Sequence, residues 1–279
     1  MSEQLLEIKN LVVRYGGRRG GKTVIQDVSL DIRAGETVSL VGESGSGKTT
    51  IGRAILGLAP VTEGTITFRG QEISNISRAQ RRRAARDIQV IFQDPYSSLN
   101  PSMTVESILV EPLRAAGVTK GRARVRELLD AVGLPADAGS RYPREFSGGQ
   151  RQRIAIARAL ALDPAVIVCD EPTSALDVTT QARVLTLLAD LQKDTGVAYL
   201  FISHDLGVVH AISDRIAVLK GGSIVEIGDA HQVATAPAHP YTRKLQMSAP
   251  IADPPRQRAR RTARLQALAA EAATTGPTS

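Results

Sequence analysis

The stretch Gly42-Glu43-Ser44-Gly45-Ser46-Gly47-Lys48-Thr49 has the spacing G-x-x-x-x-G-K-[ST] of a phosphate-binding loop. An apolar run, Thr37–Val41, precedes it, and a helical pattern, Thr49–Leu58, follows it, as this loop requires. Its glycines let successive backbone N–H groups turn toward phosphate oxygens, and the N-terminus of the following helix adds partial positive charge. The sequence therefore predicts a P-loop that binds a nucleotide.

The residue types in this loop suit distinct tasks. Lys48 is expected to reach the β- and γ-phosphates, and the hydroxyl of Thr49 is expected to bind Mg²⁺. A flexible Gly/Ser loop without a ligand is the alternative, and the flanking strand and helix speak against it. We expect nucleotide contacts from Gly42, Ser44, Gly45, Ser46, Gly47, Lys48, Thr49 and Thr50.

A P-loop needs a carboxylate for the metal at the end of a neighbouring strand. The apolar run Ala165–Cys169 ends in Asp170, an acid that would otherwise be costly at that position, and Glu171 follows directly. We predict that Asp170 holds Mg²⁺, directly or through water, and that Glu171 polarises the attacking water. Two adjacent acids after a strand could also cap a helix. The presence of a P-loop favours the interpretation that they act at a metal site. No Asn/Thr-Lys-x-Asp sequence for reading guanine is present, which favours ATP.

Composition restricts the class of protein. Of the 279 residues, 42% are hydrophobic, enough for a sizeable core, whereas 3% aromatic content without Trp disfavours stacking of single-stranded nucleic acid. The single cysteine, Cys169, excludes a disulfide framework and Cys-ligated zinc or iron–sulfur sites, and it fits a reducing compartment. We attribute the net charge of +7 to a solvated face at Arg78–Arg86 and a loose tail. Without an apolar run of about 20 residues or a signal peptide, we expect a soluble cytoplasmic protein.

Short apolar runs alternate with longer helical patterns along the chain. The runs predict buried strands at Thr37–Val41, Ile88–Phe92, Ala165–Cys169 and Val197–Ile202. The helical patterns cover Thr49–Leu58, Arg122–Val132, Gln150–Leu162 and Thr180–Asp194. Strands separated by helices predict an α/β fold with a mostly parallel wound sheet.

Two further segments predict antiparallel pairs, and one predicts an insertion. Thr65–Arg69 pairs with Glu72–Ile73 through Gly70, and Arg215–Leu219 pairs with Ile224–Ile227. Residues 95–162 show helical patterns broken by proline and glycine and no strand, which predicts a helical subdomain inserted in the connectivity of the sheet. We place one ATPase domain at 1–235, a C-terminal motif region at 236–251 and a poorly ordered tail at 252–279.

Ser147-Gly148-Gly149-Gln150 precedes the helix that runs to Leu162. A serine hydroxyl and glycine N–H groups at a helix N-terminus form a second anion site. Together with the P-loop, this segment resembles the Leu-Ser-Gly-Gly-Gln signature of ATP-binding cassette (ABC) ATPases, with Phe146 in the Leu position. The resemblance implies the ABC-ATPase fold, and a head-to-tail dimer in which Ser147, Gly148, Gly149 and Gln150 close on the ATP of a second subunit.

Other positions match the family over roughly residues 5–235. Tyr15 resembles the aromatic residue that stacks on adenine, and Gln93 resembles the Q-loop glutamine that senses Mg²⁺ and the water. Ser174–Asp177 is similar to the D-loop of the dimer interface. His204 is similar to the switch histidine that contacts the γ-phosphate, so the resemblance implies catalytic roles for His204 and Gln93 beside Glu171.

Two stretches narrow the subfamily. Residues 92–101, Phe92-Gln93-Asp94-Pro95-Tyr96-Ser97-Ser98-Leu99-Asn100-Pro101, are similar to the Q-loop region of oligopeptide/dipeptide importer ATPases. His239-Pro240-Tyr241-Thr242 resembles the C-terminal motif of that subfamily, although four residues alone also suit a proline-bearing turn. Some members carry a cysteine cluster for an iron–sulfur centre near the C-terminus, which this chain lacks because Cys169 is its only cysteine.

The resemblance implies an ATP-hydrolysing subunit of a multi-subunit importer. Its partners would be a second ABC ATPase subunit, two transmembrane permease subunits and, indirectly, an extracytoplasmic solute-binding protein, with no nucleic acid. It would lie peripherally on the cytoplasmic face of the cell membrane. Nickel and glutathione are alternative substrates within the subfamily. ABC ATPases of DNA maintenance carry coiled coils or zinc-binding cysteines, translation-associated ones usually hold two cassettes, and non-ABC P-loop kinases lack the signature, so these fit less well.

Overall fold

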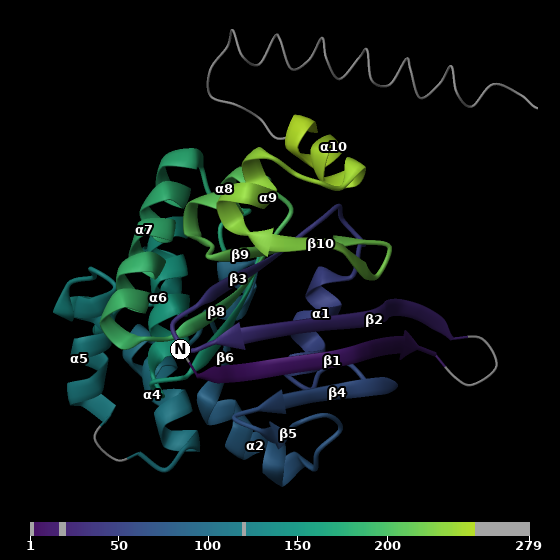
Figure 1. Ribbon diagram of the computed structural model, residues 1–279. Helices are drawn as coiled ribbons and strands as arrows, with labels where there is room; N and C mark the ends of the chain where they lie inside the picture. The colour runs from purple at the N-terminus through teal and green to yellow at the C-terminus, as the bar shows by residue number, and fades with distance from the viewer. Residues whose placement is uncertain (1–2, 17–20, 119–120, 249–279) are drawn as a thin grey trace, which may run out of the picture.

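The structure is a computed structural model that describes residues 3–16, 21–118 and 121–248. Two β-sheets share an apolar core, with helices around them (Figure 1). The larger sheet has the strand order β10-β9-β3-β8-β7-β6. Its strands are β3 (Thr37–Val41), β6 (Ile88–Ile91), β7 (Val166–Asp170), β8 (Ala198–Ser203), β9 (Arg215–Lys220) and β10 (Ser223–Asp229).

The four apolar runs of the sequence form the neighbouring strands β3, β8, β7 and β6, which pair in parallel. Strand β9 also runs parallel to β3, and only β10 is antiparallel, paired with β9. The prediction of a mostly parallel wound sheet is confirmed. Because these strands are parallel, the loops that follow β3, β6, β7 and β8 all emerge at one edge of the sheet.

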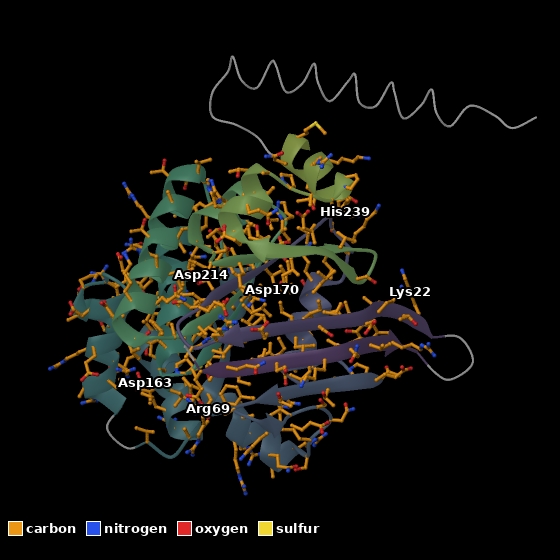
Figure 2. All side chains as sticks on the ribbon, in the orientation of Figure 1. Lys22, Arg69, Asp163, Asp170, Asp214 and His239 are labelled. Carbon is orange, nitrogen blue, oxygen red and sulfur yellow. The ribbon has the colours of Figure 1, made fainter. Side chains whose placement is uncertain are left out.

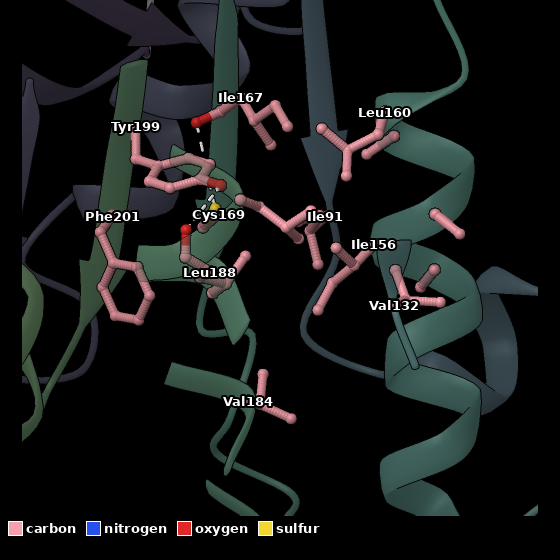
Figure 3. Close-up of a cluster of buried hydrophobic side chains, with 14 of the residues drawn as sticks. Ile91, Val132, Ile156, Leu160, Ile167, Cys169, Val184, Leu188, Tyr199 and Phe201 are labelled. Carbon is pink, nitrogen blue, oxygen red and sulfur yellow. Dashed lines mark hydrogen bonds between the residues drawn. The ribbon is translucent and has the colours of Figure 1, made fainter. Parts of the chain in front are cut away.

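Both faces of this sheet are buried. In β7, Val166 and Val168 face the core shared with the smaller sheet, whereas Ile167 and Cys169 face the core under the helices. Strand β8 alternates in the same way: Figure 3 shows Tyr199 and Phe201 on the helical side, where the Tyr199 hydroxyl donates to the backbone oxygen of Leu188 at 3.1 Å. Burial on both faces explains why these strands read as continuous apolar runs.

The smaller sheet is antiparallel and has the order β2-β1-β4-β5. Its strands are β1 (Gln4–Tyr15), β2 (Lys22–Arg33), β4 (Glu63–Phe68) and β5 (Gln71–Glu72). The β4–β5 pair is as predicted, but the sequence analysis missed β1 and β2. Register shifts interrupt their apolar alternation, and Asn10 and Asp27 take positive φ angles of 49° and 52°. The Asn10 amide donates to Asp27 Oδ1 at 2.7 Å, so polar side chains hold this irregular pairing.

The helices follow the predicted pattern with shifted ends. They are α1 (Lys48–Ile55), α2 (Arg78–Asp87), α3 (Pro95–Ser98), α4 (Val105–Ala115), α5 (Gly121–Ala131), α6 (Gly148–Leu160), α7 (Val178–Thr195), α8 (Leu206–Ile212), α9 (Ala230–Thr235) and α10 (Pro240–Ser248), with short 3₁₀ segments η1 (Ala136–Ser140) and η2 (Pro143–Glu145). Between Pro95 and Leu162, the described residues form helices and loops without a strand.

Four helices, α2, α8, α9 and α10, lie outside the predicted helical ranges. The arginine cluster forms α2, whose N-terminus is closed by reciprocal hydrogen bonds of Ser77 and Gln80 and which buries none of its residues, so it does present a solvated face. His239–Thr242 leads into α10 rather than a simple turn. The predicted poor order of 252–279 concerns residues outside the described part. Among the described residues, no helix combines the length and apolar character needed to cross a bilayer.

Candidate functional site

The P-loop joins β3 to α1, and two of its glycines are required by close packing. Gly47 has a φ of 108°, and a Cβ there would lie 2.5 Å from Ile25 Cδ1. A Cβ on Gly42 would lie 2.2 Å from the backbone oxygen of Leu219. A side chain at position 42 would therefore displace β9 from the loop, and one at position 47 would be strained by the positive φ and would force the Ile25 side chain to move.

Lys48 is buried at the start of α1 and points back into the loop. Its Nζ donates to the backbone oxygens of Gly42 at 2.8 Å and Glu43 at 2.9 Å. Burial lowers the pKa of Lys48, while the nearby charges of Glu171 and Asp170 act in the opposite direction. The ammonium group thus lies inside the loop, ready to exchange carbonyl oxygens for phosphate oxygens.

The side chains of Thr49 and Asp170 meet between α1 and the end of β7. The Thr49 hydroxyl donates to Asp170 Oδ1 at 2.9 Å. Burial raises the pKa of Asp170 above its usual value, despite this hydrogen bond. A hydroxyl and a carboxylate oxygen suit Mg²⁺, which typically binds one or two protein oxygens and completes its shell with water and substrate phosphates. The described residues contain no group of three or more His, Cys, Asp or Glu side chains that could hold a metal ion.

Glu171 is the centre of a second cluster. Its Oε2 lies 3.2 Å from His204 Nδ1 and accepts a hydrogen bond from Gln93 Nε2 at 3.2 Å. These residues follow β7, β8 and β6, so the parallel sheet brings them together at one edge. The backbone of Glu171 is held at a φ of 48°, and its N–H donates to the Ile202 oxygen at 2.9 Å. This left-handed conformation is costly for a non-glycine residue, and such strain is often found at functional sites.

One cavity of about 940 Å³ lies over both clusters. Of the predicted site residues, it is lined by Ser44, Gly45, Gly47, Lys48, Thr49, Thr50, Gln93, Glu171 and His204. Gly42, Ser46 and Asp170 are not among its lining residues. Six further lining residues were not anticipated from the sequence: Lys22, Val24, Glu43, Asp205, Leu206 and Leu245. Figure 2 labels Lys22 at one end of β2 and Asp170, which ends β7, near the middle of the view.

Tyr15 lies outside the set of described residues that line the cavity. It ends β1, opposite Lys22 of β2 in the register, and 37% of it is exposed. Its predicted stacking on adenine stays a prediction.

Ser147–Gln150 lies away from this cavity, at the N-terminus of α6. The Ser147 hydroxyl accepts from the Gln150 N–H at 3.3 Å, and the Gln150 side chain accepts from the Ser147 N–H at 3.0 Å. None of the four residues lines the cavity described above. The two elements for which anion binding was predicted therefore do not share one cavity.

The comparisons with known proteins agree with this geometry. Residues 25–174 match the family described as "ABC transporter", and residues 225–276 match "Oligopeptide/dipeptide transporter, C-terminal region". This chain belongs to the ABC transporter family. It is 52% identical over 269 residues to "Glutathione import ATP-binding protein GsiA" of Escherichia coli (strain K12) and 51% identical to the protein of that name from Salmonella paratyphi A. Each alignment covers 93% of this chain and 43% of the relative, so the chain spans less than half the length of these relatives.

Solved structures show the same fold. The ATP-binding cassette MJ0796, in a dimeric post-hydrolysis state bound to ADP and Pi, superposes with a TM-score of 0.72 at 31% identity, covering 81% of this chain and 99% of that one. CbiO1 of Clostridium perfringens, part of the ABC transporter complex cbiONQ, gives a TM-score of 0.74 at 26% identity over 83% of this chain and 91% of that one. The predicted ABC-ATPase fold is confirmed.

Proposed function

We propose that this chain binds and hydrolyses ATP and thereby drives import through a separate membrane permease. The observation that carries this proposal is the convergence of the P-loop, the Thr49–Asp170 pair and the Glu171 cluster on one cavity. A phosphate cradle, a metal-binding pair and a carboxylate held by two polar side chains are the parts that phosphoryl transfer to water requires.

In this proposal, different groups of the chain bind the phosphates, hold the metal and orient the attacking water. Lys48 and the loop N–H groups bind the β- and γ-phosphates, and Thr49 and Asp170, with Gln93, hold Mg²⁺. When bound, Mg²⁺ offsets negative charge on the phosphate oxygens. Glu171 orients and polarises the attacking water, while His204 and Gln93 position the Glu171 carboxylate through the contacts at 3.2 Å. In this proposal, His204 also contacts the γ-phosphate, and Gln93 also contacts the water.

We further propose that hydrolysis takes place between two cassettes. Ser147–Gln150 forms a capped helix N-terminus, and none of its residues lines the chain's own cavity. A head-to-tail pair, with a second copy or a paralogue, would bring the signature of one subunit onto the nucleotide of the other. The dimeric state of the MJ0796 cassette with ADP and Pi supports such a pairing.

Short peptides are the proposed cargo. The C-terminal match to oligopeptide/dipeptide transporters supports peptides, and the similarity to GsiA supports glutathione, itself a tripeptide, as a second candidate. Selectivity would reside in a solute-binding protein and two permease subunits. The chain would be held at the cytoplasmic face of the membrane through those permeases.

The segment Tyr96–Glu106 is the proposed contact with the permease, because it directly follows Gln93. Glu106 lies in a surface groove between α4 and α5 and forms an ion pair with Arg122 at 3.1 Å. A cytoplasmic helix of the permease docked along this segment would sense movements of Gln93 when a nucleotide binds.

Uptake into proteoliposomes tests the proposed function. The full complex with its permease and solute-binding protein is expected to import dipeptides, oligopeptides or glutathione only when MgATP is present on the side of the membrane where the cassettes lie. Glu106→Lys is expected to lower uptake severalfold while leaving ATP hydrolysis by the isolated cassettes unchanged, because exposed ion pairs contribute little to stability.

The matched control is Glu72→Lys, an equal charge reversal on exposed β5, for which normal uptake is expected. Uptake that does not depend on ATP would refute the import function. Normal uptake by the Glu106→Lys complex would refute the docking site and leave the import function standing.

A further inference from the structure

Helix α10 contacts the P-loop directly. The backbone N–H of Glu43 donates to the hydroxyl of Tyr241 at 3.1 Å, although the two residues are 198 positions apart. Leu245, one turn further along α10, lines the cavity above the P-loop. Figure 1 shows α10 lying over β10, beside the loop that joins β3 to α1. One face of α10 therefore belongs to the surroundings of the candidate nucleotide site.

The backbone of Glu43 connects Tyr241 to Lys48 through two successive peptide groups. The peptide between Gly42 and Glu43 donates its N–H to the Tyr241 hydroxyl, and its carbonyl, the Gly42 oxygen, accepts from Lys48 Nζ at 2.8 Å. The carbonyl of Glu43, in the next peptide, accepts from Lys48 Nζ at 2.9 Å and from the Ser46 N–H at 3.2 Å. A shift of the Glu43 backbone would move the acceptors that hold the Lys48 ammonium and the turn that leads to Ser46.

Tyr241 itself is held firmly. It is 6% exposed, and Lys220 Nζ lies 5.0 Å from the centroid of its ring. Burial raises the pKa of Tyr241, so its hydroxyl is neutral at physiological pH. A buried hydroxyl that meets a backbone N–H is a strong local constraint, because separation would leave a polar group without a partner.

The N-terminus of α10 is fixed to the large sheet. The carboxylate of Glu226, on β10, accepts from the N–H groups of Ala238 at 2.8 Å and His239 at 3.1 Å. His239 Nδ1 accepts from the Tyr241 N–H at 3.1 Å, and His239 lies at the base of α10 in Figure 2. Burial disfavours the charged form of Glu226, but the hydrogen bonds that it accepts outweigh burial and lower its pKa. An ionised carboxylate thus anchors the segment that presents Tyr241.

We propose that Tyr241 is a positioning residue for phosphate binding: its hydroxyl holds the Glu43 backbone and, through it, the P-loop and Lys48 in the geometry that receives the nucleotide. The proposal rests on the proposed ATP-binding function and assigns to the C-terminal helix a part in it. We expect loss of the Tyr241 hydroxyl to weaken the affinity for the phosphate chain of the nucleotide. The rate of hydrolysis at saturating ATP is expected to be unchanged.

Tyr241→Phe tests this, because it removes the hydroxyl and keeps the ring. Calorimetric titration of the full chain with MgATP and with magnesium tripolyphosphate is expected to show Kd raised about 2- to 10-fold for both probes, the size expected for one hydrogen bond. In the complete complex, KM for ATP is expected to rise with kcat unchanged. The control is Tyr142→Phe, a tyrosine outside the cavity whose ring lies against Arg144, for which wild-type affinity is expected.

The outcomes separate the two proposals. Wild-type affinity of Tyr241→Phe for both probes, or a lowered Tm with unchanged affinity, would refute the positioning role. Failure of the wild-type chain to bind MgATP would instead refute the proposed function.

Discussion

Replacing Glu171 by Gln is expected to reduce ATP turnover by about 10²–10⁴-fold while ATP binding is retained. The substitution keeps the size of the side chain and its ability to contact Gln93, but it removes the negative charge that faces His204 and the water. Lys48, Thr49 and the loop N–H groups are untouched, so the nucleotide remains bound. Phosphate release by the purified complex at saturating ATP measures the loss, and a nucleotide titration measures binding.

A matched control is Glu127→Gln on α5, where the carboxylate is 64% exposed and pairs with Arg124 on the surface. Its turnover is expected to equal that of the wild type. Near-normal hydrolysis by the Glu171→Gln complex would remove Glu171 from the proposed mechanism. Loss of nucleotide binding would show that Glu171 supports the cavity rather than the chemistry.

Mixing two inactive variants is expected to restore activity if the signature acts on a neighbouring subunit. A pair of Lys48→Ala chains has two defective phosphate sites, and a pair of Ser147→Arg chains has two defective signatures. A mixed pair has one composite site with both defects and one with none. Random mixing at equal amounts is expected to restore up to about a quarter of wild-type hydrolysis, because half of the pairs are mixed and one of their two sites is intact.

Ser147→Arg also removes the side chain that closes the N-terminus of α6, a loss of about 1 kcal/mol, so its Tm is compared with that of Ser147→Ala. If the complex pairs this chain with a paralogue, the P-loop substitution is made in one of the two subunits and the signature substitution in the other. If mixed pairs form, as shown by differently tagged chains, and no activity returns, the signature does not act across the interface.

Elements whose physical requirements lie within a short stretch of sequence were the ones that the sequence predicted. Thr37–Val41 and Ala165–Cys169 were predicted because strands buried on both faces need continuous apolar residues. The meeting of Thr49 and Asp170 also followed, since parallel strands end at one edge of a sheet. Strands β1 and β2 were not predicted, because the irregularities at Asn10 and Asp27 interrupt the alternation of apolar and polar residues from which a strand is predicted.

Long-range packing was not predictable in the same way. The motif His239–Thr242 indicated a subfamily, but nothing in its composition tells which loop a C-terminal helix will contact. The hydrogen bond from the Glu43 N–H to Tyr241 depends on the turn between α9 and α10 and on the Glu226 carboxylate, which accepts from that turn. Likewise, Val24 and Leu245 reach the cavity from opposite parts of the chain, and only the three-dimensional arrangement brings them together.

Titration of the full chain with MgATP tests the central claim most directly: that the cavity above Lys48 is the nucleotide site. The wild type is expected to bind one nucleotide per chain, and Lys48→Ala is expected to bind at least about tenfold more weakly, as for the loss of a hydrogen bond to a charged group. Lys193→Ala on α7, where the ammonium is 77% exposed, serves as the control and is expected to bind normally. Equal affinity of the wild type and Lys48→Ala, or no binding by the wild type, would contradict the claim.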